Sequence, residues 1–135
     1  MSNLGEKNVF RWVLLRHIGS PDDIQGVHFD LLLEDKEFCR TWRLSDIPLL
    51  DGPFVDSFYI APHHLYWLDI EEKVVSGQRG FATRIKQGIC LQSLPSIDSS
   101  SINLSLMWDN LEVDLLINGN GCRIASKKSN YFVSS

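Results

Sequence analysis

Apolar and polar residues alternate in short runs along much of this chain, and a period of two residues is typical of a β-strand with one buried face. The clearest runs are residues 102–106 and 113–117. Between them stands Asp109-Asn110, two residues that tolerate the positive φ angles of a tight hairpin turn. Asn118-Gly-Asn-Gly121 predicts the next reversal for the same reason. The last third of the chain is therefore expected to form hairpin-connected strands.

Nine runs of this kind predict nine strands, whereas helical periodicity is hard to find. The strands are expected at residues 9–16, 27–34, 37–44, 65–69, 80–86, 89–93, 102–108, 112–118 and 122–125. A chain of 135 residues has the usual size of one domain. We therefore expect a single all-β, antiparallel domain, either a sandwich or a β-barrel, with residues 1–8 as a flexible N-terminus and residues 127–135 as a C-terminal tail.

The charge of the chain limits what it can bind. Its 17 acidic residues exceed its 13 Lys and Arg and give a net charge of −4, whereas sequence-independent binding to a phosphate backbone normally rests on several cations. Any contact with nucleic acid is therefore expected to be local. Two short basic stretches, residues 79–86 and 123–128, stand out, and solvated strand faces or tails are the simpler interpretation of both.

The cysteine pattern and the N-terminal sequence indicate the cellular compartment. Cys39, Cys90 and Cys122 are odd in number, widely spaced and without a CxxC pair, which favours reduced thiols over a disulfide framework or a zinc finger. The first residues contain no apolar signal segment, and no later apolar run has the length of a membrane span. We expect a cytoplasmic protein without membrane contact.

The pair His28 and Asp30 is the best candidate for chemistry. In a strand, residues two apart project from one face, roughly 6.5–7 Å apart along the chain, so that both can reach one ion. His17, at the end of the preceding strand, becomes a third ligand if the two strands pair. Two imidazoles and a carboxylate suit zinc, manganese or iron and leave positions for water or a substrate oxygen. The alternative is a His-x-Asp on the wet face of a strand, which is common.

The neighbours of this pair favour a lined cavity. The face that carries it continues through Leu32, whereas Phe29, Leu31 and Leu33 form the other face of the same strand. One apolar and one mixed face predict that the polar pair lies in a cavity such as the mouth of a barrel.

Several blocks of sequence stand in an order that is typical of one known family. The first blocks are Val13-Leu-Leu-Arg-His17, His28-Phe-Asp-Leu-Leu-Leu-Glu34 and Thr41-Trp42. They are followed by His63-His-Leu-Tyr-Trp-Leu-Asp-Ile-Glu71, and then by Gly77-Gln-Arg-Gly80 with Lys86-Gln-Gly88. Together these blocks resemble the phosphoesterase domain of bacterial DNA ligase D. The resemblance covers roughly residues 9–90, and the order of the blocks carries more weight than any single motif.

This resemblance implies a β-barrel that uses a divalent ion, most often Mn²⁺ with Zn²⁺ as an alternative, to remove ribonucleotides and phosphates from DNA 3′ ends. Its metal ligands fall on His17, His28 and Asp30, and its histidine near the scissile phosphate falls on His63, a place for a general acid or a transition-state donor. The expected substrate-binding residues are Glu34, Arg43 and Arg79. The expected partners are DNA or RNA 3′ ends and a separately encoded ligase or polymerase.

The chain departs from the family where a phosphate would need cations and donors. Leu32 takes the place of an arginine, Val55 aligns near a second arginine, and Trp67 falls on a tyrosine. The available replacements are Tyr66, Arg43, Arg79 and Arg84. By strand alternation only one of His63 and His64 can point into a shared cavity. A degenerate β-barrel that binds a metal, ligand or partner protein without turnover therefore stands as the alternative to an enzyme.

Overall fold

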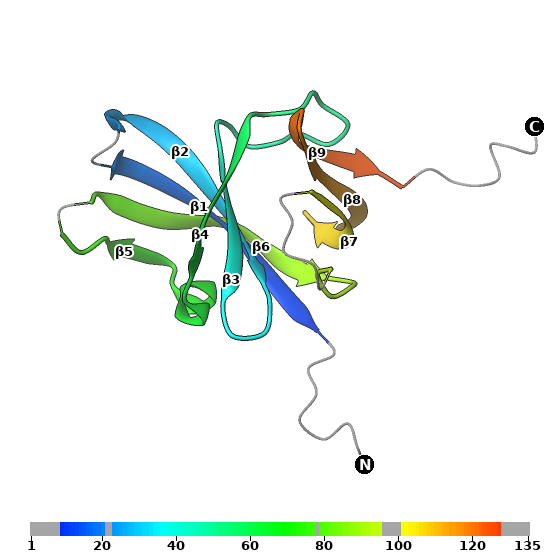
Figure 1. The fold of residues 1–135 in the computed structure, drawn as a ribbon, viewed down its shortest axis with the longest axis horizontal. Coiled ribbons are helices and arrows are strands. Elements are labelled where there is room, and N and C mark those ends of the chain that lie inside the picture. Colours follow the sequence, from blue (N-terminus) through cyan, green and yellow to red (C-terminus); the bar gives the residue numbers. More distant parts are fainter. Residues whose placement is uncertain (1–8, 21–22, 78, 96–100, 128–135) are drawn as a thin grey trace, which may run out of the picture.

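The computed structural model describes residues 9–20, 23–77, 79–95 and 101–127, and all the strands in these ranges belong to one antiparallel sheet. The elements are β1 (Phe10–Ser20), β2 (Asp23–Glu34), β3 (Cys39–Leu44), β4 (Ser57–His63), a 3₁₀ helix η1 (Leu65–Asp69), β5 (Glu72–Val74), β6 (Phe81–Cys90), β7 (Ile102–Trp108), β8 (Leu111–Asn118) and β9 (Gly121–Ser126). The described strands follow the order β4-β3-β2-β1-β6-β7-β8-β9, and β5 pairs with β6 beside this path (Figure 1). The expected flexible N-terminus, residues 1–8, and all but the first residue of the expected C-terminal tail, residues 127–135, lie outside the described residues.

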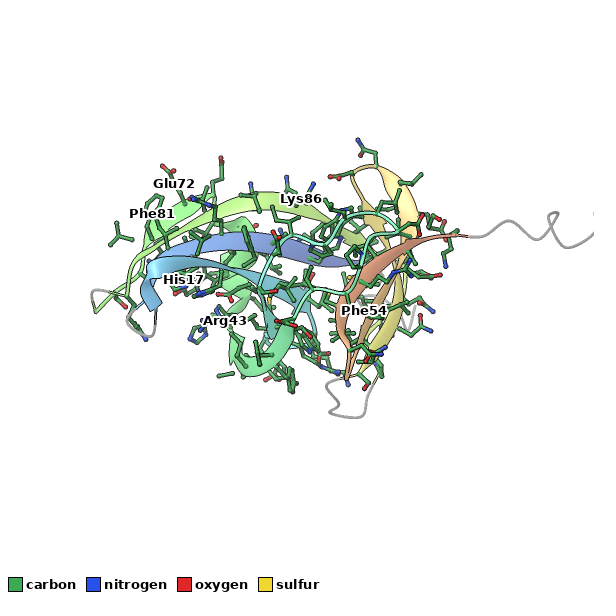
Figure 2. All side chains as sticks on the ribbon, turned by 90° about the horizontal axis from the view of Figure 1, so that it is seen from above. His17, Arg43, Phe54, Glu72, Phe81 and Lys86 are labelled. Atoms are coloured by element: carbon green, nitrogen blue, oxygen red, sulfur yellow. The ribbon has the colours of Figure 1, made fainter. Side chains whose placement is uncertain are left out.

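The sheet curls into a half-barrel, and the segment between β3 and β4 spans its open side. In this segment Val55 and Cys122 of β9 exchange backbone hydrogen bonds of 2.9 and 2.8 Å, and Leu50 bridges Ile124. Phe54 accordingly lies beside β9 in Figure 2. The all-β, antiparallel fold expected from the alternation is confirmed.

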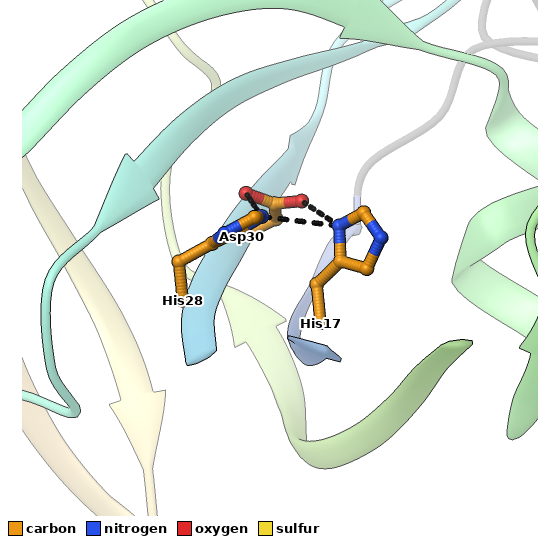
Figure 3. A group of neighbouring side chains, drawn as sticks. All are labelled: His17, His28 and Asp30. Atoms are coloured by element: carbon orange, nitrogen blue, oxygen red, sulfur yellow. Dashed lines mark hydrogen bonds and ion pairs between the residues drawn. The ribbon is translucent and has the colours of Figure 1, made fainter. Parts of the chain in front are cut away.

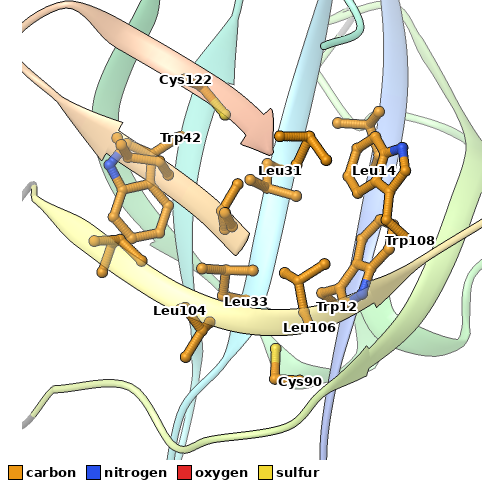
Figure 4. Packing of buried hydrophobic residues seen from close by; sticks show 14 of the residues in the cluster. Trp12, Leu14, Leu31, Leu33, Trp42, Cys90, Leu104, Leu106, Trp108 and Cys122 are labelled. Atoms are coloured by element: carbon orange, nitrogen blue, oxygen red, sulfur yellow. The ribbon is translucent and has the colours of Figure 1, made fainter. Parts of the chain in front are cut away.

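The main core fills the concave side of the sheet, between β1–β3 and β7–β9 (Figure 4). Trp12 and Trp108 stack across it with ring centroids 4.6 Å apart, and the Trp12 indole donates a hydrogen bond of 2.9 Å to the carbonyl of Met107. Gly88 stands opposite Trp12 on β6, where any Cβ would meet the indole nitrogen at 2.7 Å. Glycine is therefore required for this close packing.

A second, smaller core lies on the other face of the same strands. Val13 and Leu15 of β1 and Leu32 of β2 pack there against Trp67 and Leu68 of η1. Phe29, Leu31 and Leu33 point into the main core instead, so the expected two-faced character of β2 is confirmed. β2 is buried on both faces because η1 covers the side that a half-barrel would otherwise expose.

The elements that differ from expectation lie mainly between residues 57 and 90. Residues 65–69, expected as a strand, form η1, because an apolar run this short has no period that separates a strand from a helical turn. Strands β4 and β5 were not expected; both are edge strands with mostly exposed side chains and little alternation. The two strands expected at 80–86 and 89–93 form the single strand β6, which passes through Gly88 without a turn.

Other local expectations are confirmed in the last third of the chain. Asp109 and Asn110 both have positive φ, 52° and 66°, and they join β7 to β8 as a tight hairpin.

In the described part of the chain, no helix has the length and apolar character needed to cross a membrane.

Candidate metal centre

His17, His28 and Asp30 converge at one end of the β1–β2 pair (Figure 3). His17 and His28 stand directly opposite each other in the antiparallel register, and Asp30 follows two residues later on the same face. The expectation that pairing of the two strands would bring His17 to the other two residues is confirmed. Asp30 and His28 are 3% and 8% exposed, which is low for charged or polar side chains.

The spacing of the ligand atoms fits a single metal ion. Nε2 of His28 lies 3.0 Å from Nδ1 of His17, and the two Asp30 oxygens lie 3.9 Å from these nitrogens, one from each. Two atoms that both bind an ion at about 2.1 Å can be at most about 4.2 Å apart. The two 3.9 Å separations involve different Asp30 oxygens, and with one ligand atom from each residue all three atoms lie within 4.8 Å of one another, so the group could hold a metal ion.

The backbone of a distant segment determines which nitrogen of His17 faces the ion. Nε2 of His17 lies 2.6 Å from the carbonyl oxygen of Arg79, which can only accept, so that Nε2 carries the proton. Nδ1 of a neutral His17 then has a free lone pair, and it accepts the hydrogen bond from Nε2 of His28. Because a metal ligand must be deprotonated, binding of an ion requires His28 to give up the Nε2 proton and to break this hydrogen bond.

Arg43 supports Asp30 from the neighbouring strand. It stands opposite Asp30 in the β2–β3 register, and its Nε lies 3.3 Å from the carboxylate oxygen Oδ1. The guanidinium side chain is 30% exposed, whereas that of Asp30 is 5% exposed. Such a partner orients a ligating carboxylate, and part of the guanidinium stays open to solvent.

The centre lies on the face of the sheet that carries the smaller core, not on the face that carries the main core. Leu15 stands opposite Asp30, and Ala82 of β6 stands beside His17, both as members of the smaller core. The expectation of a cavity in the mouth of the barrel is therefore wrong in its location. The physical reason is that the half-barrel is filled by main-core side chains, and the polar face of β2 is left for η1 and its neighbours.

His63 ends β4 and belongs to the electrostatic surroundings of the centre. Its Nδ1 donates to the carbonyl of Ala61 at 3.3 Å, and its ring meets Trp67 edge-on. Burial lowers the pKa of His63, the charges of Arg43 and His17 act in the same direction, and Asp30 opposes them. A lowered pKa favours the neutral imidazole, and with the ring proton on Nδ1 the Nε2 atom is a hydrogen-bond acceptor.

The other expected site residues lie at different distances from the centre. Arg79 contacts it through its backbone, while its guanidinium donates to the carbonyl and hydroxyl of Ser76. Glu34 lies at the far end of β2, four residues after Asp30, where it accepts a hydrogen bond of 2.8 Å from the backbone amide of Arg11. The structure does not bring Glu34 to the other site residues, and the substrate-binding roles of Glu34, Arg43 and Arg79 stay predictions.

Both His63 and His64 line a cavity next to the centre, so the expectation that only one of them could point into a shared cavity is wrong. The reason is that the strand ends at His63, and alternation no longer applies to the next residue. The cavity also contains a residue that the sequence analysis missed. Lys73 also lines it, from the unexpected strand β5. No local pattern marks Lys73, since it reaches this place only through the pairing of β5 with β6.

Comparison with known families and proteins identifies no relative: no family model matches the chain, and neither does any curated protein.

Proposed function

We propose that this protein is a divalent-metal-dependent phosphoesterase that acts on nucleic-acid 3′ ends, as its resemblance to the phosphoesterase domain of DNA ligase D implies. The observation that carries the proposal is the convergence of His17, His28 and Asp30 on one point of a sheltered sheet face. Two nitrogens and one oxygen suit Mn²⁺, the ion of the family, and Zn²⁺ is the alternative. A role in DNA repair follows from the substrate.

In this proposal the bound ion supplies Lewis acidity and an activated water for phosphoester hydrolysis. The chain's own residues position the reaction. His17 is held by the Arg79 carbonyl and Asp30 by Arg43, so that both ligands are oriented before an ion arrives. His63 is neutral through its lowered pKa and carries its one ring proton on Nδ1, so it donates to a phosphate oxygen through Nε2 only after that proton moves from the Ala61 contact to Nε2.

The position of Arg43 favours the interpretation of the protein as an enzyme over that of a degenerate binding protein. The family's arginine two positions after the aspartate is Leu32 here, and Leu32 is fully buried in the smaller core, so it leaves no room for a cation. Arg43 approaches the same carboxylate from the adjacent strand and is partly exposed. It can therefore take over the interaction with a phosphate that the missing arginine would make.

The proposal is tested by incubating the full chain with Mn²⁺ and a DNA primer that ends in a 3′-phosphate or a 3′-ribonucleotide. We expect release of the terminal group by the wild type and loss of release in Asp30→Asn, which keeps the shape of the side chain but removes its charge. Asp56→Asn is the matched control, because Asp56 is exposed and lies outside the centre. Absence of release by a wild type that binds Mn²⁺ would refute the proposal and leave the non-catalytic alternative.

A further inference from the structure

A second feature adjoins the metal centre: a cavity of about 380 Å³ between the end of β4, η1 and the β5–β6 hairpin. Its volume is within the range of small-ligand sites. Six of its lining side chains bear on what it binds, namely His63, His64, Tyr66, Trp67, Lys73 and Arg79.

The charge of this cavity is opposite to that of the chain. Among the described residues that line it are two histidines, Lys73 and Arg79, and no carboxylate. The whole chain has a net charge of −4. A local group of cations in an acidic protein attracts an anion to one place rather than to the whole surface.

Lys73 and Arg79, the lysine and arginine of the cavity, each have a hydrogen-bond donor that is not used by the described residues. Lys73 makes no hydrogen bond or ion pair with the described residues, and its Nζ lies 5.8 Å from the centroid of the Tyr66 ring. Arg79 uses Nε and Nη2 on Ser76, and its Nη1 has no partner in the described part of the chain. The ammonium and the guanidinium nitrogen can therefore both donate to one phosphate group.

Aromatic rings stand beside these donors. Tyr66 is 49% exposed, and its ring stacks on His64 with centroids 5.6 Å apart and an interplanar angle of 14°. Trp67 lies next to Tyr66, with ring centroids 5.5 Å apart. Cations beside exposed aromatic rings are the combination by which proteins hold the phosphates and bases of single strands.

We propose that this cavity binds a nucleotide of a single nucleic-acid strand, with Lys73 and Arg79 on a phosphate and Tyr66 against a base. The inference rests on the proposed function for its substrate class, and it adds a binding site that needs no metal ion. Arg79 joins the two sites, because its guanidinium side chain lines the cavity while its carbonyl holds His17. A strand bound here is placed next to His17.

The test measures binding of a short fluorescent oligodeoxynucleotide to the full chain, by anisotropy in EDTA and over a range of salt concentrations. The variant Lys73→Gln/Arg79→Gln changes two exposed side chains and leaves the Arg79 carbonyl in place. Its matched control is Lys36→Gln/Arg16→Gln, which removes the same charge from exposed positions outside the cavity.

We expect the cavity variant to bind about tenfold more weakly and to lower the log–log salt slope by about 0.7, the value for one phosphate of a single strand, while the control stays near the wild type. Equal losses in both variants, unchanged binding in the cavity variant, or no binding by the wild type would each overturn the inference.

Two further measurements are needed. One distinguishes binding of a base from binding of a phosphate alone, and the other distinguishes this inference from the proposed function. A strand without the bases of its last two nucleotides should bind about fivefold more weakly, and equal binding would overturn the assignment of a nucleotide in favour of a bare phosphate. His28→Ala should bind the intact strand like the wild type, because the cavity needs no ion. Binding without 3′-end release refutes only the proposed function, whereas release that is unaffected in the cavity variant refutes only this inference.

Discussion

Nε2 of His17 donates a hydrogen bond of 2.6 Å to the carbonyl oxygen of Arg79, a residue 62 positions further along the chain. This contact joins the end of β1 to the connection between β5 and β6. It turns Nδ1 of His17 towards His28 and Asp30. The orientation of one candidate metal ligand thus depends on the backbone of a loop whose side chains line the neighbouring cavity.

The wild-type protein should be stabilised by Mn²⁺ or Zn²⁺. An ion that binds only the folded state at 100 times its dissociation constant adds about 2.7 kcal/mol to the free energy of unfolding. We expect His28→Ala to lose this gain, because two ligands remain of three. Urea denaturation with and without the ion measures it, and His64→Ala, outside the group of three, is the control. An equal gain in His28→Ala would place the ion elsewhere.

Gly80→Ala should weaken metal binding from outside the centre. Gly80 has a φ of +93°, and a Cβ there would overlap the carbonyl oxygen of Ile18, so the loop that carries Arg79 must move. We expect a loss of about 1–3 kcal/mol in the free energy of unfolding, together with weaker metal affinity. Gly119→Ala is the matched control, since a Cβ there meets nothing within 4 Å. Calorimetric titration with the metal measures the affinity of both variants. Wild-type affinity in both would contradict the expectation.

Arg43→Gln should lower metal affinity without removing a ligand. The guanidinium is 3.3 Å from the Asp30 carboxylate, and loss of such a supporting group typically weakens metal binding by about 10–100-fold. Arg16→Gln provides the comparison, because Arg16 is exposed although it precedes His17 directly. Competition with a metal-sensitive dye measures both affinities. Similar values for the two variants would mean that Arg43 has no orienting role.

The stability of the fold should fall in alkaline solution through its cysteines. Burial raises the pKa of Cys39, Cys90 and Cys122 to about 12, from an ordinary value near 9. Because the folded state keeps the thiols protonated, their contribution is complete below about pH 9 and is lost as the pH rises towards 12. Each thiol should lower the free energy of unfolding by about 1 kcal/mol per pH unit in this window.

Urea denaturation of the wild type and of Cys122→Ala, between pH 8 and 11, isolates one thiol. The variant should be less stable at pH 8, because it loses buried volume, but its stability should fall less steeply above pH 9. Parallel slopes for the two proteins would show that the Cys122 thiol is accessible to hydroxide in the folded state.

Local sequence determined the hairpins of the fold and the three candidate ligands of the centre, but not what surrounds those ligands. Alternation predicted the β7–β8 hairpin, and Asp109-Asn110 predicted its turn, because strand period and turn residues act over a few positions. The same period placed His28 and Asp30 on one face of β2, and the pairing of neighbouring strands then brought His17 to them. These relationships need no information beyond one hairpin.

Only the tertiary structure decided what surrounds this group. The edge strands β4 and β5 have weak patterns because they bury little, and they obtain their partners from β3 and β6. The Arg79 carbonyl reaches His17 through a backbone contact that carries no side-chain signal. The centre faces the smaller core because main-core side chains already fill the half-barrel, and that choice of face depends on how the whole sheet curls rather than on the period of any one strand.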